Sequence, residues 1–200
     1  MNKKAEKILN TTIKLFIHEG VKKITMDDIA EKASASKVTI YKYFMDKDSL
    51  YLEVGKRIFS HFTDNLNNIM VSDDVLIKKL YDYLNAVSEF TNSGQFDLGI
   101  ELTRYNQDVE TEFKLYSQAY RDSMFTLIDK GMRDGLFKSG LDKDMIFHYI
   151  DMGIVYYQQS SEYRNKVLND SIFKQQFLLF YISNIFVDGA KMLSLPYEVI

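Results

Sequence analysis

Proline is almost missing from this chain: Pro196 is the only one among 200 residues. Proline interrupts helices because it lacks a backbone donor and its ring clashes with the preceding turn. Apolar side chains also recur at spacings of three and four along most of the chain, which is the period of one helix face. The sequence therefore predicts an all-α protein.

The apolar spacing and the positions of glycine predict where the helices lie. We expect long helices over residues 3–18, 47–70, 74–90, 109–133, 142–160 and 171–193, and short helical material over 97–105. The last of these helices is apolar around most of its circumference. A helix on the outside of a monomer needs only one apolar stripe, so this helix is expected either to be central in the core or to face a partner subunit.

Two short helices are expected between the first two long ones. Thr25 is suited to cap the first, and Asp28 three residues later completes a capping-box pattern. Ser36 is suited to cap the second, over residues 37–44, in which Ile40 and Phe44 lie one turn apart and face inward. The other positions of this helix combine positive charge, hydroxyls and aromatic rings without one acidic residue. That composition is typical of a helix that lies in a DNA groove.

The stretch TMDDIAEKASASKVTIYKYFMDKDSL resembles the helix-turn-helix of the TetR family of bacterial transcriptional regulators. The matching residues are Thr25, Ile29-Ala30, Ser36-Lys37, Thr39-Ile40-Tyr41, Tyr43-Phe44, Lys47 and Leu50. Two positions depart from the family pattern, which usually has glycine at Ser34 and often at Val38. We expect a strained backbone at Ser34. Val38 adds an apolar side chain to the side of the helix expected to face DNA, so the base preference is not expected to match that of a relative.

The resemblance implies a three-helix helix-turn-helix DNA-binding domain over residues 1–47 and a helical ligand-binding and dimerisation domain over 48–200. It implies a repressor that binds a palindromic operator in double-stranded DNA as a homodimer and is released by a small hydrophobic or aromatic effector. The residues expected at the DNA are Lys37 and Val38 on the bases, Thr25, Ser36, Tyr41, Lys42, Tyr43 and Lys47 on phosphates, and Thr39 beside them. Lys47 is unfavourable for the dipole at a helix start, so we expect a phosphate contact there rather than a structural purpose.

The body is rich in aromatic residues at helical spacing. Most such residues simply form core, yet buried tyrosine hydroxyls need partners, which favours a cavity with polar groups. The expected pocket residues are Arg104, Tyr105, Phe113, Tyr116, Tyr120, Tyr149, Tyr157 and Gln158. The family's dimer interface, formed by the last two long helices, implies Phe177, Phe180, Tyr181, Asn184 and Ile185 as interface residues.

Catalytic and metal-binding patterns are missing from the sequence. There is no cysteine, and His18, His61 and His148 are far apart. No phosphate-binding loop or nucleophile elbow is present either. We therefore expect no enzyme activity, no cofactor and no metal. No targeting segment or membrane-spanning stretch is found, so we expect a cytoplasmic protein without a membrane partner.

Charge is distributed unevenly along the chain. Residues 1–47 hold ten lysines against six acidic residues, whereas residues 48–200 hold fifteen basic and twenty-two acidic residues. A basic head on an acidic body fits DNA binding by the head alone. Two alternatives stay open: a DNA-binding architectural or division-linked protein on the same fold with no inducer, and a helical enzyme with the head as a remnant.

Overall fold

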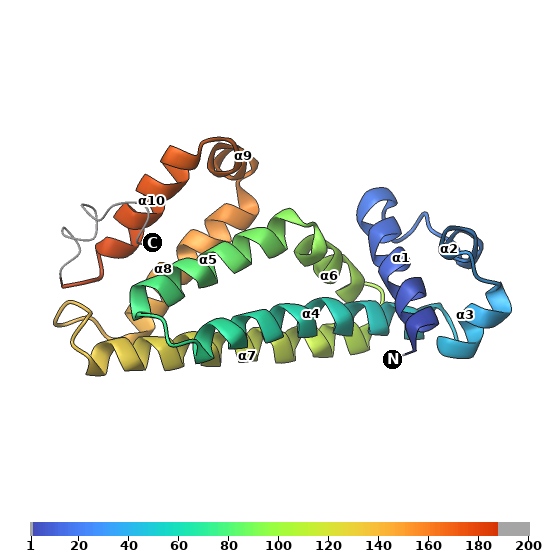
Figure 1. Cartoon of the computed structure of the whole chain (residues 1–200), viewed down its shortest axis with the longest axis horizontal. Helices are drawn as coiled ribbons and strands as arrows, with labels where there is room; N and C mark the ends of the chain where they lie inside the picture. The colour runs from blue at the N-terminus through green and yellow to red at the C-terminus, as the bar shows by residue number, and fades with distance from the viewer. Residues whose placement is uncertain (1, 188–200) are drawn as a thin grey trace. The chain divides into compact units, whose positions relative to one another are not determined.

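The computed structural model describes residues 2–187, and this part of the chain is helical throughout apart from turns and one isolated bridge pair (Figure 1). The elements are α1 (Lys3–Glu19), α2 (Met26–Ala33), α3 (Lys37–Tyr43), α4 (Lys47–Val71), α5 (Leu76–Asn92), α6 (Gln95–Thr103), α7 (Gln107–Arg133), α8 (Lys143–Gln159), α9 (Ser161–Asn169) and α10 (Ser171–Ser183). The all-α prediction is confirmed. Among the described residues, no helix is both long and apolar enough to cross a membrane.

Local capping explains why most predicted helix bounds agree with the structure. Asn2 accepts a hydrogen bond from the backbone N–H of Lys4 at the start of α1, and Gly20 ends that helix with a φ of 87°. Asp142 caps α8 in the same way. α9 was not among the predicted helices, because this short helix buries only Val167 and so carries no apolar stripe.

The predicted helix over residues 171–193 is wrong at its end. Within the described residues α10 stops at Ser183, and the following backbone pairs with the turn after α7. Lys138 N–H donates to the Ile185 carbonyl at 2.9 Å, and Val187 N–H donates to the Leu136 carbonyl at 2.9 Å. These bonds, between segments far apart in sequence, replace the next helical turn. Residues 188–193 lie outside the described part of the chain.

The chain divides into two compact units, and the division falls inside three of its helices. Unit 1 comprises residues 1–64 and 90–119, and unit 2 comprises residues 65–89 and 120–200. Unit 1 therefore contains the first three helices together with α6 and parts of α4, α5 and α7. The predicted domain boundary after residue 47 stays a prediction.

Unit 1 is built on α1 and on a cluster of aromatic rings. α1 packs against α2 and α3 and buries Ile8 and Phe16. The aromatic cluster joins α4 to the parts of α5 and α7 in the same unit; its members are Phe59, Phe62, Phe90, Phe113 and Tyr116. The closest pair is Phe62 and Phe90, whose stacked rings lie 4.3 Å apart.

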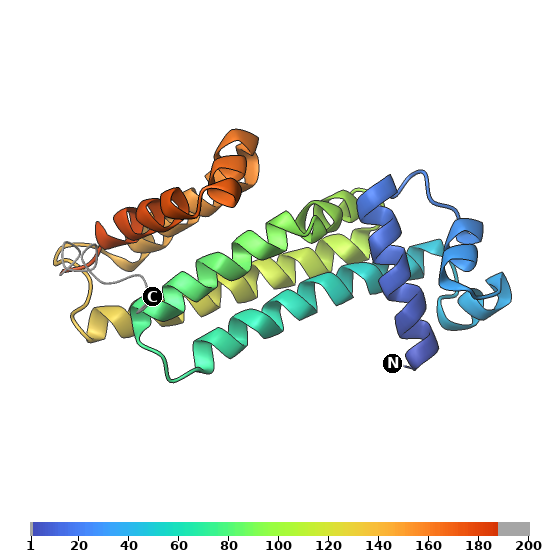
Figure 2. The ribbon, with the colours of Figure 1, turned by 45° about the horizontal axis from the view of Figure 1, so that its top comes forward.

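In unit 2, α8 and α10 run side by side in both views (Figures 1 and 2). The stacked rings of Tyr149 and Tyr181 lie 4.5 Å apart, and the Tyr149 hydroxyl donates to the Tyr181 carbonyl at 2.8 Å. A Cβ at Gly153 would stand 3.0 Å from the Tyr181 ring, so glycine allows the close approach of the two helices.

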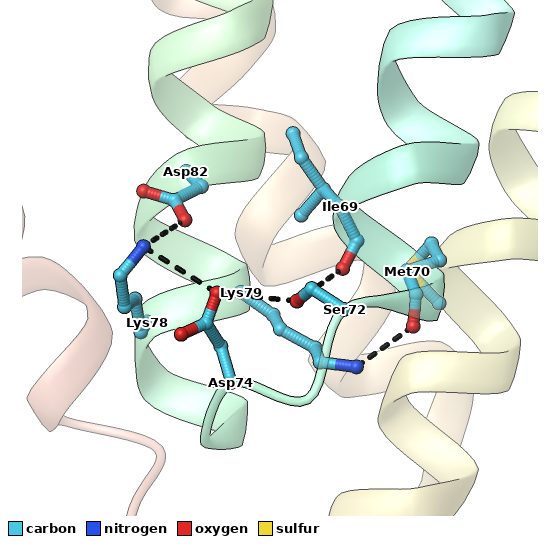
Figure 3. A network of polar contacts seen from close by, with 7 residues as sticks. All are labelled: Ile69, Met70, Ser72, Asp74, Lys78, Lys79 and Asp82. Atoms are coloured by element: carbon cyan, nitrogen blue, oxygen red, sulfur yellow. Dashed lines mark hydrogen bonds and ion pairs between the residues drawn. The ribbon is translucent and has the colours of Figure 1, made fainter.

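A network of polar contacts closes the turn between α4 and α5, within unit 2 (Figure 3). The buried Lys79 donates to the Met70 carbonyl at 2.7 Å, and the Ser72 hydroxyl donates to the Ile69 carbonyl at 3.0 Å. These donors satisfy carbonyls that the end of α4 leaves unpaired, and the ammonium complements the helix dipole. The same turn carries an ion-pair chain of Asp74, Lys78 and Asp82.

Candidate nucleic-acid interface

The two helices of the expected DNA-reading motif are fixed by side-chain caps. Thr25 and Asp28 form the predicted capping box: Asp28 N–H donates to the Thr25 hydroxyl at 3.3 Å, and Thr25 N–H donates to the Asp28 carboxylate at 2.8 Å. The Thr25 hydroxyl also donates to the Asp28 carboxylate at 2.7 Å, and this bond, together with the one from Thr25 N–H, lowers the pKa of Asp28. Ser36 caps α3 by accepting from Thr39 N–H at 3.1 Å. Both predicted caps are confirmed.

The turn between these helices passes through a left-handed residue. Ser34 has φ 53° and ψ 48°, and it is the one non-glycine residue with positive φ in the described part of the chain. Ala35 N–H donates to the Ala30 carbonyl at 2.9 Å, which closes the end of α2 as a glycine at this position normally would. The strain predicted at Ser34 is confirmed.

Replacing Ser34 with glycine should stabilise the protein. Glycine removes the steric cost of the left-handed conformation, offset in part by its greater freedom in the unfolded chain, and we expect a net gain of about 0.5–1 kcal/mol in the free energy of unfolding. Urea unfolding followed by circular dichroism measures it. Ser34→Ala keeps the strain and should stay close to the original chain. A lower unfolding midpoint for Ser34→Gly would contradict this account.

α3 is held by very few apolar contacts and exposes the rest of its surface. Ile40 is fully buried and Phe44, just after the helix, is 3% exposed. In contrast, Val38 is 80% exposed and Tyr41 is 45% exposed. Lys37 and Lys42 are also exposed, and Thr39 and Tyr43 are half-buried. The helix therefore presents charged, hydroxyl and apolar groups outward from a small apolar anchor.

Lys37 is held by an acidic residue of the preceding helix. Its ammonium lies 2.7 Å from the Asp27 carboxylate, and this hydrogen bond raises the pKa of Lys37. Both side chains are well exposed, so the pair is worth little to stability. Asp27 instead sets the position of Lys37, and any anion that approaches the Lys37 ammonium must compete with this carboxylate.

Lys47 makes a structural contact that was not predicted. Its ammonium donates to the Ile24 carbonyl at 2.9 Å and lies over the Tyr51 ring at 5.6 Å. The expectation that Lys47 has no structural purpose is therefore wrong. Its unfavourable place at the start of α4 is offset by Asp46, whose carboxylate accepts from Ser49 N–H at 2.7 Å.

The nine residues predicted at the DNA all lie in unit 1, between residues 25 and 47. Thr25 and Ser36 are exposed at the starts of α2 and α3, α3 itself supplies six, and Lys47 is half-buried at the start of α4. Their contact with DNA stays a prediction. Asp27 and Asp46 were missed as neighbours of this surface, although the pattern of Asp46 three residues before Ser49 could have identified the second.

The residues predicted for the pocket are divided between the two units. Arg104, Tyr105, Phe113 and Tyr116 belong to unit 1, where the last two join its aromatic cluster. Tyr120, Tyr149, Tyr157 and Gln158 belong to unit 2. Of these eight residues only Tyr157 lines the cavity of unit 2, which adjoins α5, α8, α9 and α10.

The residues predicted for the dimer interface also differ in their environments. Phe180 is 59% exposed and Asn184 is exposed, whereas Ile185 is buried within its own chain. Phe177 and Tyr181 line the cavity of unit 2. An interface through these residues stays a prediction. Within the described residues, no group of three or more His, Cys, Asp or Glu side chains could hold a metal ion.

Comparison with known sequences identifies the amino-terminal part of the chain. The sequence model for "Bacterial regulatory proteins, tetR family" matches residues 8–54. The chain is 21% identical over 154 residues to the HTH-type transcriptional repressor KstR2 of Rhodococcus jostii, covering 72% of each chain. It is 30% identical over 88 residues to IcaR of Staphylococcus aureus, a negative transcriptional regulator of the biofilm operon icaADBC. That match covers 42% of this chain and 47% of IcaR, so it spans about half of that relative.

Solved structures share the fold over nearly the whole chain. A TetR-family regulator from Vibrio parahaemolyticus matches with a TM-score of 0.65 at 16% identity, covering 92% of this chain and 99% of that one. The ketosteroid transcriptional regulator KstR2 of Mycobacterium tuberculosis matches with a TM-score of 0.63 at 17% identity, covering 94% and 97%.

Proposed function

We propose that this chain, which belongs to the TetR family of bacterial regulatory proteins, is a cytoplasmic repressor that binds a palindromic operator as a homodimer and is released by a small molecule. Its relatives are DNA-binding transcriptional regulators rather than enzymes, and this chain is a DNA-binding transcriptional regulator as well. The observation that carries the proposal is the outer surface of α3, which is exposed, free of acidic residues and fixed by caps at both short helices.

In this proposal α3 enters the major groove. Lys37 and Val38, at the start of the helix, contact base edges, and the hydroxyls and ammonium groups around them contact phosphates. The α3 helices of two subunits would lie about one DNA turn apart, roughly 34–36 Å or a small multiple of it. The operator should therefore be an inverted repeat.

An exposed apolar surface on α8 and α10 supports the homodimer. Met145, Met152 and Tyr156 lie on one side of α8 and are each more than half exposed. On α10, Ile172 and Phe180 are exposed to a similar degree. Exposed apolar groups gathered on neighbouring helices usually mark an interface. Two copies of this surface would make a symmetric four-helix interface.

Release by a small molecule follows from population shift. A ligand that binds the body more tightly in a conformation unfit for the operator shifts the chain toward that conformation, by no more than its differential affinity. α4, a continuous helix from Lys47 to Val71, would transmit the change. Unchanged operator affinity with a ligand demonstrably bound would count against this part of the proposal.

Selection of bound sequences from a random duplex pool at two salt concentrations tests the proposal. Enrichment of one inverted repeat that survives the higher salt is the expected result. Binding that is lost with salt and enriches no sequence would indicate an architectural protein held mainly by phosphates. No binding at either salt concentration would reject a DNA-binding role for α3.

Removing Lys37 should alter sequence preference as well as affinity. We expect Lys37→Ala to weaken operator binding about 10- to 100-fold, and to relax the preference at one base pair of each half-site. Lys42→Ala, the control, should weaken binding to all duplexes alike. It should also reduce the slope of log affinity against log salt concentration by about one per subunit. Fluorescence anisotropy on operator and random duplexes measures both variants. Equal losses on the two duplexes for Lys37→Ala would reject its role at the bases.

A further inference from the structure

A cavity of about 70 Å³ lies within unit 2, bordered by α5, α8, α9 and α10. Its wall is mostly apolar and aromatic, with Leu84, Ile154 and Phe177 among the lining residues. Among the described residues of this lining, Lys174 is the one that carries a charge, and none is acidic. The cavity therefore combines an apolar interior with a single positive charge.

Some polar groups in the lining are already used by the protein. The Ser88 hydroxyl donates to the Tyr157 hydroxyl at 2.9 Å, and the Tyr181 hydroxyl donates to the Tyr149 carbonyl. These bonds hold α5 to α8 and α8 to α10, so these groups are part of the framework.

Three other polar groups in the lining have no such use. Within residues 2–187, the Lys174 ammonium, the Tyr163 hydroxyl and the Asn85 amide have no hydrogen-bond or ion-pair partner. Burial raises the pKa of Tyr163 to about 12, so its hydroxyl keeps its proton at neutral pH and can donate. An ammonium and two neutral donors on one cavity complement a group that accepts several hydrogen bonds and carries one negative charge.

We propose that this cavity binds a small monocarboxylate, with the carboxylate on Lys174, Tyr163 and Asn85 and a compact apolar body against the aromatic wall. The proposal rests on the ligand-responsive function proposed above and names the site and class of the effector. A neutral ligand would leave the ammonium unpaired, and a dianion would bring a charge that the lining does not neutralise. One carboxylate balances the single lysine.

The size of the cavity limits the apolar body. About 70 Å³ is room for roughly two water molecules at the ~30 Å³ that each occupies in the liquid. An apolar cavity of about 150 Å³ holds one benzene ring. This space therefore receives a short branched chain or part of a single ring, and the rest of such a ligand extends through its open side. The expected ligand is thus no larger than benzoate or phenylacetate.

Isothermal titration calorimetry on the full chain tests the proposal with benzoate and its neutral analogue benzamide. We expect benzoate to bind the original chain more tightly than benzamide. Lys174→Met keeps the length of the side chain and removes its charge, and it should weaken benzoate about 10- to 100-fold while leaving benzamide unchanged. Tyr163→Phe removes one neutral donor and should weaken benzoate about 3- to 10-fold. Lys166→Met is the matched control on α9, because Lys166 pairs with Asp170 outside the cavity lining.

Equal affinity of Lys174→Met and the original chain for benzoate would overturn the proposal. So would the absence of saturable binding of benzoate and phenylacetate at millimolar concentration. Operator affinity, measured separately by anisotropy, distinguishes this failure from failure of the proposed function. Operator release by other compounds without benzoate binding would reject the site and leave ligand-responsive repression standing. Benzoate binding that depends on Lys174 but leaves operator affinity unchanged would support the site and reject release through it.

Discussion

Phe180→Glu is expected to convert the homodimer into a monomer and to lower operator affinity more than 100-fold. The symmetric interface contains this residue twice, so each dimer would bury two carboxylates without partners. Burying an unpaired charge costs several kcal/mol, and about 3 kcal/mol already corresponds to more than a 100-fold loss of affinity. A monomer also keeps only one of the two half-site contacts.

Sedimentation equilibrium and operator anisotropy measure the two effects. The free energy of unfolding of the monomer should change little, because Phe180 is 59% exposed within its own chain. Leu115→Glu is the matched control: Leu115 is 62% exposed but belongs to α7, outside the proposed interface. A Phe180→Glu chain that remains a dimer at micromolar concentration would place the interface elsewhere.

Ile40→Ala is expected to cost about 2–4 kcal/mol in the stability of α3 and to reduce operator binding with it. Ile40 is fully buried and is the only buried residue within α3. A helix of seven residues has almost no stability of its own. Removing most of this anchor should let α3 open locally, before the rest of unit 1 unfolds.

Hydrogen exchange of the α3 amides measures that opening, and anisotropy measures the loss of operator affinity. Val38→Ala separates anchoring from recognition: Val38 is 80% exposed, so its loss should change stability by less than about 0.5 kcal/mol while altering base preference. Unchanged exchange rates in α3 for Ile40→Ala would contradict this account, because they would show that other contacts of α3 hold the helix in place.

Features that depend on neighbouring residues in the chain were predictable. The capping box of Thr25 and Asp28, the cap of Ser36 and the strain at Ser34 each involve groups within a few positions of one another. The anchoring of α3 by Ile40 and Phe44 was also predictable from their spacing, since residues one turn apart share a helix face. These local rules, with the resemblance they support, gave the helical class and the expected DNA surface.

Features that join distant segments were not predictable. The bond from Lys47 to Ile24 and the ion pair of Lys37 with Asp27 require the helices to be placed first. The end of α10 depends on backbone pairing with a segment more than forty positions away.

The sequence by itself determined the helical class, most helix starts and the composition of the α3 surface, because caps, spacing and charge act over one or two turns. Only the tertiary structure decided which aromatic residues share an interior. The chain has 14 tyrosines and 14 phenylalanines, many of them at the same helical spacing. That spacing gives the face of a helix but not its neighbour, so Tyr116 joined the cluster of unit 1 and Tyr163 joined the cavity of unit 2. Packing between helices made that choice, and it also placed Lys174 beside the cavity.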